Sequence, residues 1–352
     1  MAADGHPFAD RAAGAIVGGF IGDALALGVH WYYDLEEQRA NHGEWISGYT
    51  APLPGRYHEG LNPGDPSQAG IILELLLDSV ARRGFYDEED FCDRMDHELL
   101  PHLDGTPKGG PGGYTNHSLR QVWQARIGEG KSWSEAAGDA DTSEGAERAI
   151  IPAARHARNL RTVAESAASC CRLSQSDALV VQQSTAFAMV LADLIGGGTF
   201  DPGISGRLFD GIRNGQIPFV AKSSAAERTS LGFPSPDALL LPSWIAEMAA
   251  DPDIRIEPAW KISLVYGMSC AINFVLPAAY YLAVRFPDNF EAAVLHAING
   301  GGQNMSRACL TGALVGAQTG LSGIPERFIN GLSRGDEILR LAREVAQQAA
   351  NE

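Results

Sequence analysis

Positive charge is scarce in this sequence. Its 352 residues include 27 lysines and arginines against 43 aspartates and glutamates, a formal net charge of −16, and only four of the basic residues are lysines. A surface of this sign repels nucleic acid and anionic membranes, so we expect neither as a partner. An anionic small ligand would need a locally positive pocket, and arginine is the residue that suits phosphate and carboxylate groups.

Cysteine and long apolar runs are also rare. The five cysteines include no CxxC pair, which indicates reduced thiols rather than a disulfide framework or a zinc site. The most apolar stretches, 71–77 and 178–195, contain Glu, Gln or Asp residues, whereas a membrane span needs about 20 apolar residues. Residues 1–10 lack the basic and apolar pattern of a secretion signal, so we expect a cytoplasmic protein.

Alternating β-branched runs are almost absent, and apolar residues recur at helical spacing instead. The composition, 45% hydrophobic and 20% charged, is that of a globular domain, and no repeat or composition break divides the chain. We predict an all-α, single-domain multi-helix bundle over residues 1–352, with loose termini at 1–10 and 351–352. The expected helices cover residues 11–28, 67–83, 88–100, 119–127, 143–160, 177–195, 236–250, 265–285, 289–299, 306–316 and 336–350.

The first expected helix carries small residues on one face. Gly14, Gly18 and Gly22 recur at helical spacing. Each glycine lowers intrinsic helix stability by about 1 kcal/mol, but together they allow another helix to approach closely. We therefore expect this helix to be held by tertiary burial.

Two segments are rich in Gly and Pro and are expected to be loops. Residues 41–66 form a long irregular stretch, and such stretches inside a compact domain are usually functional or disordered. Residues 106–113 are expected to cover the surface or the mouth of a pocket. Residues 200–262 match no useful motif, and 200–234 are expected to form an insertion near the cleft.

Three segments place polar residues in apolar, Gly-rich surroundings. In the first, residues 22–34, Asp23 stands inside the expected helix, and His30 and Trp31 follow its end. A buried carboxylate is unfavourable unless it is paired, capped or liganded, and a side chain just beyond a helix can point into a cleft. The alternative is that Asp23 binds the backbone and His30 is a core histidine whose hydrogen bonds are satisfied.

The other two segments, residues 60–68 and 299–307, lead into expected helices. In the earlier one Asp65 or Ser67 can cap the helix, which explains them without any function. In the later one Gly300–Gly302 form a turn that exposes backbone N–H groups at a helix start, a geometry that suits phosphate. A plain turn and cap would give the same pattern, and the Lys-Ser/Thr pair of a P-loop is missing.

Together these segments resemble the ADP-ribosylglycohydrolase family over residues 11–335. The likeness is carried by AGAIVGGFIGDALAL at 13–27, the Asp-containing turn and helix at 64–79, SDALVVQQSTAFAMVLADLIGG at 176–197, and NGGGQNMSRACLTGALVGAQTGLSGIP at 299–325. The resemblance implies a helical bundle whose cleft is built from these loops. It also implies two Mg²⁺ or Mn²⁺ ions and hydrolysis of the glycosidic bond that joins ADP-ribose to an acceptor.

The same resemblance shows which metal ligands are missing. The family turn Thr-Asp-Asp-Thr is replaced here by Gly-Asp-Pro-Ser at 64–67, and the late motif Gly-Gly-Asp-Thr-Asp-Thr by Gly-Gly-Gln-Asn-Met-Ser at 301–306. Where the family has an acidic residue a few positions after the Gly-Asp pair, this sequence has His30. A pair of hard cations requires several carboxylate oxygens, so we expect no metal ligands and no cofactor.

Two patterns are similar to the family branch of J-type lens crystallins and selenoprotein J. They are His-Trp-Tyr-Tyr-Asp at 30–34 and Gly-Gln-Asn-Met-Ser-Arg at 302–307, although Gln303 stands where that branch usually has Asp. At least one class of these proteins serves a structural, refractive role.

Two functional hypotheses therefore compete. One is a hydrolase that acts on a glycosidic bond of an ADP-ribosyl or related phosphorylated ribosyl compound without the dinuclear metal centre. The other is a non-catalytic member that binds a nucleotide-like ligand or serves as a stable, oligomeric protein. The polar character of the motif positions favours the hydrolase. Its expected catalytic residues are His30, Asp65 and Asp23, and its expected ligand-binding residues are Trp31, Tyr32, Ser67, Gln68, Gly301, Gly302, Gln303, Asn304, Ser306 and Arg307.

Overall fold

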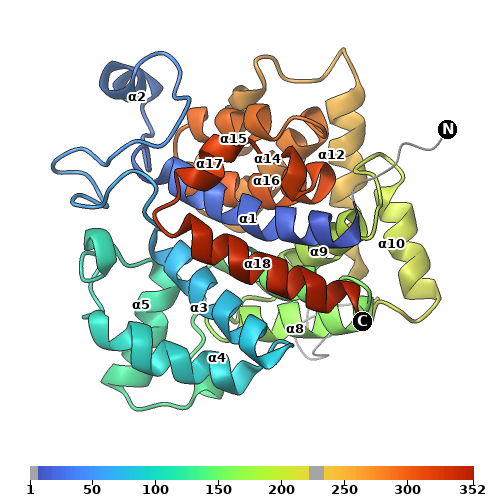
Figure 1. Ribbon diagram of the computed structural model, residues 1–352, viewed down its shortest axis with the longest axis horizontal. Helices are drawn as coiled ribbons and strands as arrows, with labels where there is room; N and C mark the ends of the chain where they lie inside the picture. The colour runs from blue at the N-terminus through green and yellow to red at the C-terminus, as the bar shows by residue number, and fades with distance from the viewer. Residues whose placement is uncertain (1–6, 222–233) are drawn as a thin grey trace.

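The computed structural model describes residues 7–221 and 234–352 and is built from helices throughout these ranges (Figure 1). The β-type pairings among them are two isolated bridges, Gly138 with Gln175 and Thr142 with Ala271. The predicted all-α bundle is confirmed. Its α-helices are α1 (Phe8–Leu27), α2 (Leu35–His42), α3 (Gln68–Arg83), α4 (Glu88–Arg94), α5 (His117–Trp123), α6 (Glu144–Arg148), α7 (Ile150–His156), α8 (Leu160–Arg172), α9 (Ala178–Ile195), α10 (Ile204–Arg213), α12 (Leu241–Ala250), α13 (Ile262–Tyr266), α14 (Ile272–Arg285), α15 (Phe290–Asn299), α16 (Asn304–Thr319), α17 (Glu326–Asn330) and α18 (Gly335–Ala350).

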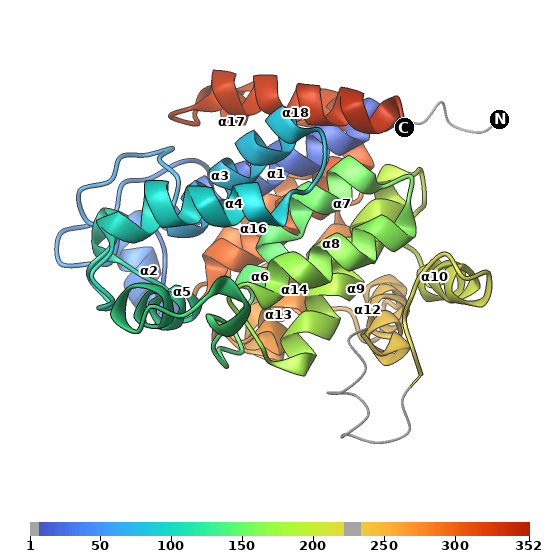
Figure 2. The ribbon, with the colours of Figure 1, turned by 90° about the horizontal axis from the view of Figure 1, so that it is seen from below.

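α1 and α16 form the centre of the bundle, and α1 lies between α16 and α18 in both views (Figures 1 and 2). Their backbones touch at the small residues. A Cβ atom added to Gly18 would lie 2.1 Å from the carbonyl oxygen of Gly312, and one added to Gly22 would lie 2.0 Å from that of Ala308. The close helix approach predicted from the glycine spacing is confirmed.

α9 is a second buried helix, packed against α7, α8, α14 and α16. By length and composition it could cross a membrane, since its 18 residues have a mean hydropathy of 1.6. However, 72% of these residues are buried inside the protein. This burial is what a core helix shows.

α18 closes the bundle by packing on α1, α3 and α7. The two ends of the described chain meet beside the end of α7. The Arg158 guanidinium lies 4.3 Å from the centre of the Phe8 ring, and Glu352 forms an ion pair of 2.5 Å with Arg155. Residues 8–10, expected to be loose, are therefore the first turn of α1, while residues 1–6 lie outside the described residues.

Some helix boundaries differ from the expected ones. The helix expected at 143–160 is split into α6 and α7, because Pro152 has no N–H to bond the carbonyl of Arg148. The helices expected at 88–100 and 119–127 continue beyond α4 and α5 as π-helical turns at Met95–Leu99 and Gln124–Gly128. α2, α8, α10 and α17 were not expected at all.

The expected position of residues 200–234 is wrong for the residues that the structure describes. α10 packs on α9 and α12, on the side of the molecule opposite α2 and α5 (Figure 1). The loop between α2 and α3 and the segment leading to α5 lie on the α2 and α5 side, so α10 does not border them. Residues 222–233 lie outside the described residues.

Candidate functional site

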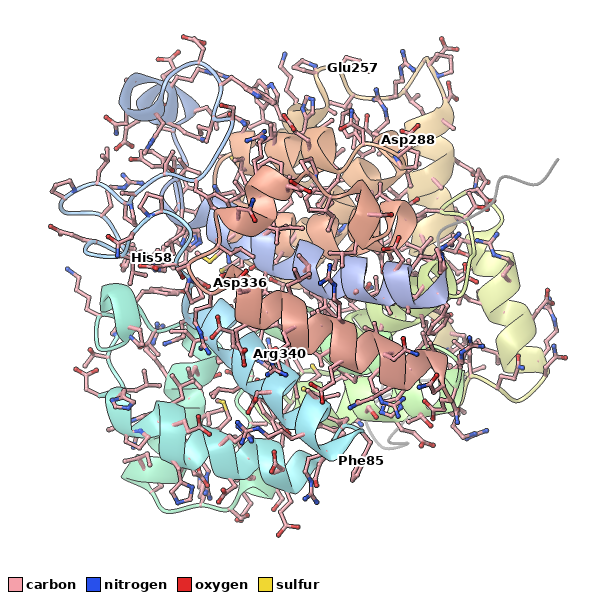
Figure 3. All side chains as sticks on the ribbon, viewed as in Figure 1. His58, Phe85, Glu257, Asp288, Asp336 and Arg340 are labelled. Atoms are coloured by element: carbon pink, nitrogen blue, oxygen red, sulfur yellow. The ribbon has the colours of Figure 1, made fainter. Side chains whose placement is uncertain are left out.

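The three polar segments come together at the end of α1 and the start of α16. Backbone bonds join the turn after α1 to the glycine turn before α16, from Trp31 N to Gly302 O (3.2 Å) and from Gly302 N to Tyr32 O (2.6 Å). The loop before α3 joins them through His58, which bonds to His30. In Figure 3, His58 lies where this loop meets the segment leading to α5. Elements far apart in the sequence thus form one buried polar site.

Gln303 lies at the centre of this site. Its Oε1 atom accepts hydrogen bonds from Trp31 Nε1 (2.5 Å) and His30 Nε2 (2.8 Å). Its Nε2 atom donates to the hydroxyl of Ser306 (2.8 Å). Both ends of the amide are therefore in use, and the glutamine fixes the positions of three other side chains.

The hydrogen bonds continue from Ser306 to a carboxyl group that sequence analysis did not identify. The Ser306 hydroxyl bonds to Glu147, and the Ser143 hydroxyl donates to the same carboxyl at 3.1 Å. Glu144, three residues earlier, accepts a short hydrogen bond from Thr142. Glu144 and Glu147 both lie in α6 and are 8% and 4% exposed, so the helix brings two carboxyls into the protein interior.

Burial changes the protonation of these acidic groups. It raises the pKa of Glu147 to about 8, with the negative charge of Glu144 as the second cause. It also raises the pKa of Glu144, and it raises the pKa of Asp23 to about 6 against the opposing effect of Ser67. At neutral pH the site therefore holds a protonated carboxyl at Glu147 near an ionised one at Asp23.

The sequence carried a signal for this pair that was missed. Two glutamates stand three residues apart at the start of a segment, 144–154, that is otherwise almost apolar. Charged groups at the edge of such a segment are either exposed or functional, and only the fold shows which.

Asp23 and Ser67 form a linked pair. Ser67 donates to the Asp23 carboxylate from its backbone N–H (2.9 Å) and from its hydroxyl (2.5 Å). The same hydroxyl accepts hydrogen bonds from the N–H groups of Ala69 and Gly70 and so caps α3. Asp23 therefore bonds to the backbone, and Ser67 caps a helix, as the structural alternatives for these residues expected. The same pair also joins α1 to α3 inside the site.

Asp65 faces its own loop. Its carboxylate accepts hydrogen bonds from Asn62 N (2.7 Å) and Asn62 Nδ2 (3.1 Å). It makes no recorded contact with the His30–Gln303 group. Among the described residues, the Asp65 carboxylate therefore bonds within its own loop and not to Asp23 or His30.

Several of the groups expected to bind ligand near the glycine turn hold the fold instead. Arg307 is 2% exposed and donates to the carbonyl oxygens of Ala297 and Gly301. The amides of residues 302, 303 and 304 bond to protein carbonyls. Asn304 donates to Val29 O at 2.9 Å, and its Oδ1 atom is buried with no partner among the described residues. These donor groups therefore already bond to carbonyl oxygens of the protein.

Aromatic rings form the outer border of the site. Trp31 lies edge-to-face with Tyr57 and Tyr114, with ring centres 5.0 and 4.9 Å apart. Trp31 has a φ of 62°, which is rare for a bulky residue and indicates local strain. Tyr32 is buried behind it under the Arg56 guanidinium. Gln68 bonds to the backbone of residues 114 and 116 and so fastens the covering loop to α3.

The donor groups present do not fit the pair of divalent ions that the resemblance implies. Gln303 Oε1 already accepts two N–H groups, and the Ser67 hydroxyl donates to Asp23. Pro66 and Met305 offer no side-chain oxygen. Within residues 7–221 and 234–352, no three His, Cys, Asp or Glu side chains are placed to hold a metal ion. Hard cations prefer a cage of several carboxylates.

Comparisons with known proteins agree on family and fold. A family model described as ADP-ribosylglycohydrolase matches residues 4–352. Crystallin J1A of Tripedalia cystophora is 23% identical to this chain, over 96% of this chain and 97% of that protein. A solved structure titled "ADP-ribosylglycohydrolase-related protein complex" has a TM-score of 0.63 and 19% identity and covers 97% of this chain and 99% of its own. The structural likeness shows a shared fold.

Proposed function

The chain belongs to the ADP-ribosylglycohydrolase family, and we propose that it hydrolyses a glycosidic bond of an ADP-ribosyl or related phosphorylated ribosyl compound without a pair of metal ions. The observation that carries this proposal is the buried carboxyl of Glu147, connected through Ser306 and Gln303 to His30. In the late motif, where the resemblance places metal ligands, Gln303 and Ser306 bond to each other and to His30 and Glu147, whereas Pro66 and Met305 offer no side-chain oxygen. A family member that had simply lost its ions would have no need for such a network.

Glu147 is the proposed general acid. Because its pKa is about 8, its carboxyl holds a proton at neutral pH and can transfer it to the leaving atom as the glycosidic bond breaks. Water then adds to the ribosyl carbon and gives its extra proton to the Glu147 carboxylate, which restores the acid. The products are the free sugar compound and the protonated acceptor.

Asp23 is the proposed electrostatic partner. Its pKa of about 6 leaves it ionised at neutral pH, and a nearby carboxylate stabilises the positive charge that develops on the sugar ring. His30 is a positioning residue here, because both of its ring nitrogens are already hydrogen-bonded. Trp31 supplies the aromatic surface for a base or sugar, together with Tyr57 and Tyr114.

The direct test is release of free ADP-ribose from ADP-ribosyl-arginine and an ADP-ribosyl-serine peptide, with and without EDTA. We expect turnover that EDTA leaves unchanged and that falls as the pH rises above about 8, where Glu147 loses its proton. Glu147→Gln should lower the rate at least about 100-fold, and Glu89→Gln, at an exposed position in α4, should leave it unchanged. Turnover that EDTA abolishes would contradict the metal-free scheme.

A non-catalytic role is the second candidate. It is favoured by the relative named Crystallin J1A and by the burial of the site, where His30 and Gln303 are only 5% and 7% exposed. If no substrate is turned over and millimolar ADP-ribose does not raise the melting temperature, this candidate replaces the hydrolase.

A further inference from the structure

Two histidines meet at the inner edge of the aromatic border. His30 Nδ1 and His58 Nε2 are 2.9 Å apart, and both side chains are buried. Two neutral imidazoles at this distance share one hydrogen bond, in which one ring donates and the other accepts. Which ring donates decides what the remaining nitrogen of His58 can bind.

Trp31 determines the direction of this bond. The indole Nε1–H can only donate, so the Gln303 atom that it meets at 2.5 Å must be the amide oxygen. His30 Nε2 meets the same oxygen at 2.8 Å and must therefore carry a hydrogen. Since burial and the neighbouring His58 lower the pKa of His30 well below its usual value, the ring is neutral and its Nδ1 has no hydrogen. His58 Nε2 is consequently the donor.

The donors then point one way through the whole network. His58 donates to His30, His30 to Gln303, Gln303 to Ser306, and Ser306 to Glu147. Hydrogen bonds that are aligned in series strengthen one another. The far end of this series is the Nδ1 lone pair of His58.

That lone pair has no partner. His58 is 0% exposed, and its Nδ1 atom makes no hydrogen bond to any residue in 7–221 or 234–352. Burial lowers the pKa of His58 to about 4, so the ring stays neutral and Nδ1 remains an acceptor near neutral pH. A buried acceptor without a donor is unfavourable, and a φ of 69° makes the position itself unusual for a non-glycine residue.

We propose that His58 Nδ1 accepts a hydrogen bond from a hydroxyl group of the sugar in the bound ligand. This assignment rests on the proposed function and names the part of the ligand that the inner site contacts. A neutral acceptor attracts hydroxyl groups and does not attract phosphate, so the phosphates bind elsewhere. The rings of Trp31, Tyr57 and Tyr114 lie next to the histidine pair and offer apolar surface to the carbon face of a sugar.

The chain above His58 is built from glycine-rich backbone. At Gly112, whose φ is 67°, a Cβ atom would lie 2.6 Å from Leu61 and 3.4 Å from the Cα of His58. The loop before α5 therefore rests directly on the loop that carries His58. Because His58 is fully buried, the proposal requires these two loops to separate before a ligand hydroxyl can reach Nδ1.

Two substitutions divide the functions of the imidazole. Asn in place of His58 puts an amide oxygen close to the Nδ1 position and also tolerates a positive φ. Gln puts an amide N–H close to the Nε2 position, which keeps the donor to His30 but removes the acceptor. His58→Asn should thus keep the contact to ligand, and His58→Gln should keep the contact to His30.

The experiment is isothermal titration of wild type, His58→Asn and His58→Gln with ADP-ribose, ribose 5-phosphate and a panel of free sugars. We expect His58→Asn to bind within about threefold of wild type and His58→Gln to bind at least about tenfold more weakly. In wild type, nitrogen chemical shifts should show an unprotonated Nδ1 at His58 that changes when the sugar binds. These shifts need only wild type, so they decide the question if His58→Gln does not fold.

The outcomes separate this inference from the proposed function. Equal binding by His58→Gln, or an Nδ1 that is protonated or unaffected by ligand, overturns the inference even if hydrolysis is observed. Binding of a non-ribosyl sugar alone, lost in His58→Gln, supports the inference and contradicts the proposed function. If no sugar or ribosyl compound binds wild type, both are wrong.

Discussion

Gln303 shows how one side chain can hold a site together. It accepts from two rings and donates to Ser306, so a single amide joins the turn after α1 to the first turn of α16. The Ser306 hydroxyl then continues the connection to Glu147 of α6. An acidic residue at this position would place negative charge beside the neutral His30 and could not donate to Ser306. The glutamine is therefore suited to a neutral network.

Gln303→Ala should destabilise the protein strongly. The substitution leaves Trp31 Nε1 and His30 Nε2 without an acceptor in a buried site, which we expect to lower the free energy of unfolding by about 3 kcal/mol. Urea denaturation measures the difference. Gln347→Ala, at an exposed position of α18, is the matched control and should change stability by less than about 0.5 kcal/mol. Equal values for both variants would show that Gln303 does not support the site.

Glu147 should make stability depend on pH. Its pKa is raised from 4.5 to about 8 in the folded protein, so the folded state binds the proton more tightly than the unfolded state. The stabilisation is complete below about pH 4.5 and is lost as the pH rises through 8. The free energy of unfolding of wild type should fall between pH 5 and pH 8. In Glu147→Gln this fall should be smaller by roughly 3 kcal/mol.

The pKa values of Glu144 and Asp23 are also raised in the folded protein. The stability of Glu147→Gln should therefore still fall with rising pH, but less than that of wild type. Thermal unfolding across this range makes the comparison, with Glu89→Gln as the control that keeps the full wild-type dependence. A Glu147→Gln curve parallel to that of wild type would show that the Glu147 carboxyl ionises normally.

Sequence patterns located part of this site. His30, Gln303, Ser67 and Asp23 were identified as polar residues in apolar surroundings, and the structure brings them together. Glu147 and His58 were missed, because their roles depend on contacts with residues far away in the chain, Ser306 and His30. The spacing of Glu144 and Glu147 marks the pair in the sequence, but nothing near Glu147 or His58 in the sequence indicates which distant residue each contacts.

The helix pair α1–α16 determines the spacing of the whole bundle. Gly14, Gly18 and Gly22 of α1 lie against Gly316, Gly312 and Ala308 of α16. Both glycine patterns end at the site, since α1 leads into His30 and α16 starts at Asn304. The contact therefore sets the positions of the two loops that hold Gln303 and His30.

Gly18→Ala should lower the free energy of unfolding by about 3 kcal/mol, because the added Cβ would lie 2.1 Å from a backbone oxygen that side-chain rotation cannot move. Gly206→Ala is the control. In α10 nothing lies within 4 Å of the added atom, so alanine should raise stability by about 0.5 kcal/mol. Calorimetry of both variants measures the contrast. A tolerated Gly18→Ala would contradict the direct backbone contact.

Helices were predictable from sequence where burial imposes a periodic pattern. α1, α3, α9 and α18 were expected close to their observed positions. α2 was missed because its sequence, LEEQRANH, has no apolar face, and Asp34 starts it by capping. The break between α6 and α7 was signalled by Pro152, but the apolar residues on both sides hid it.

At the scale of the molecule, the first and last helices lie side by side and complete each other's burial. Ile338, Leu341 and Val345 of α18 are buried, and their removal would uncover α1 and α3. The bundle is thus closed by a contact between the two ends of the sequence.

The acidic surface predicted to exclude nucleic acid and membranes remains a prediction.

A chain that ends at Ser333 should not unfold cooperatively. Loss of α18 exposes the apolar sides of α1, α3 and α7 to water. These helices belong to the core of the bundle. Circular dichroism during heating should show a broad transition, or the protein should be insoluble. A chain that ends at Ala350 loses the contacts of Glu352 with Arg155 and His156 and the hydrogen bonds of Asn351 with Gln347 and Gln348. These contacts lie at the end of the chain and near the surface, so this variant should remain within about 1 kcal/mol of the full chain. A sharp transition in the shorter chain would show that α18 is dispensable.

Because both ends of the described chain meet beside α7, the order of the helices in the sequence could be changed while their arrangement in space is kept. A short peptide linker could join residue 352 to residue 7, since Phe8 and Glu352 contact Arg158 and Arg155, which are three residues apart at the end of α7. New termini could then be opened in the exposed segment 128–132. Such a circular permutant would retain every helix contact while its synthesis began in the middle of the present chain, so it would report whether folding depends on α1 being made first.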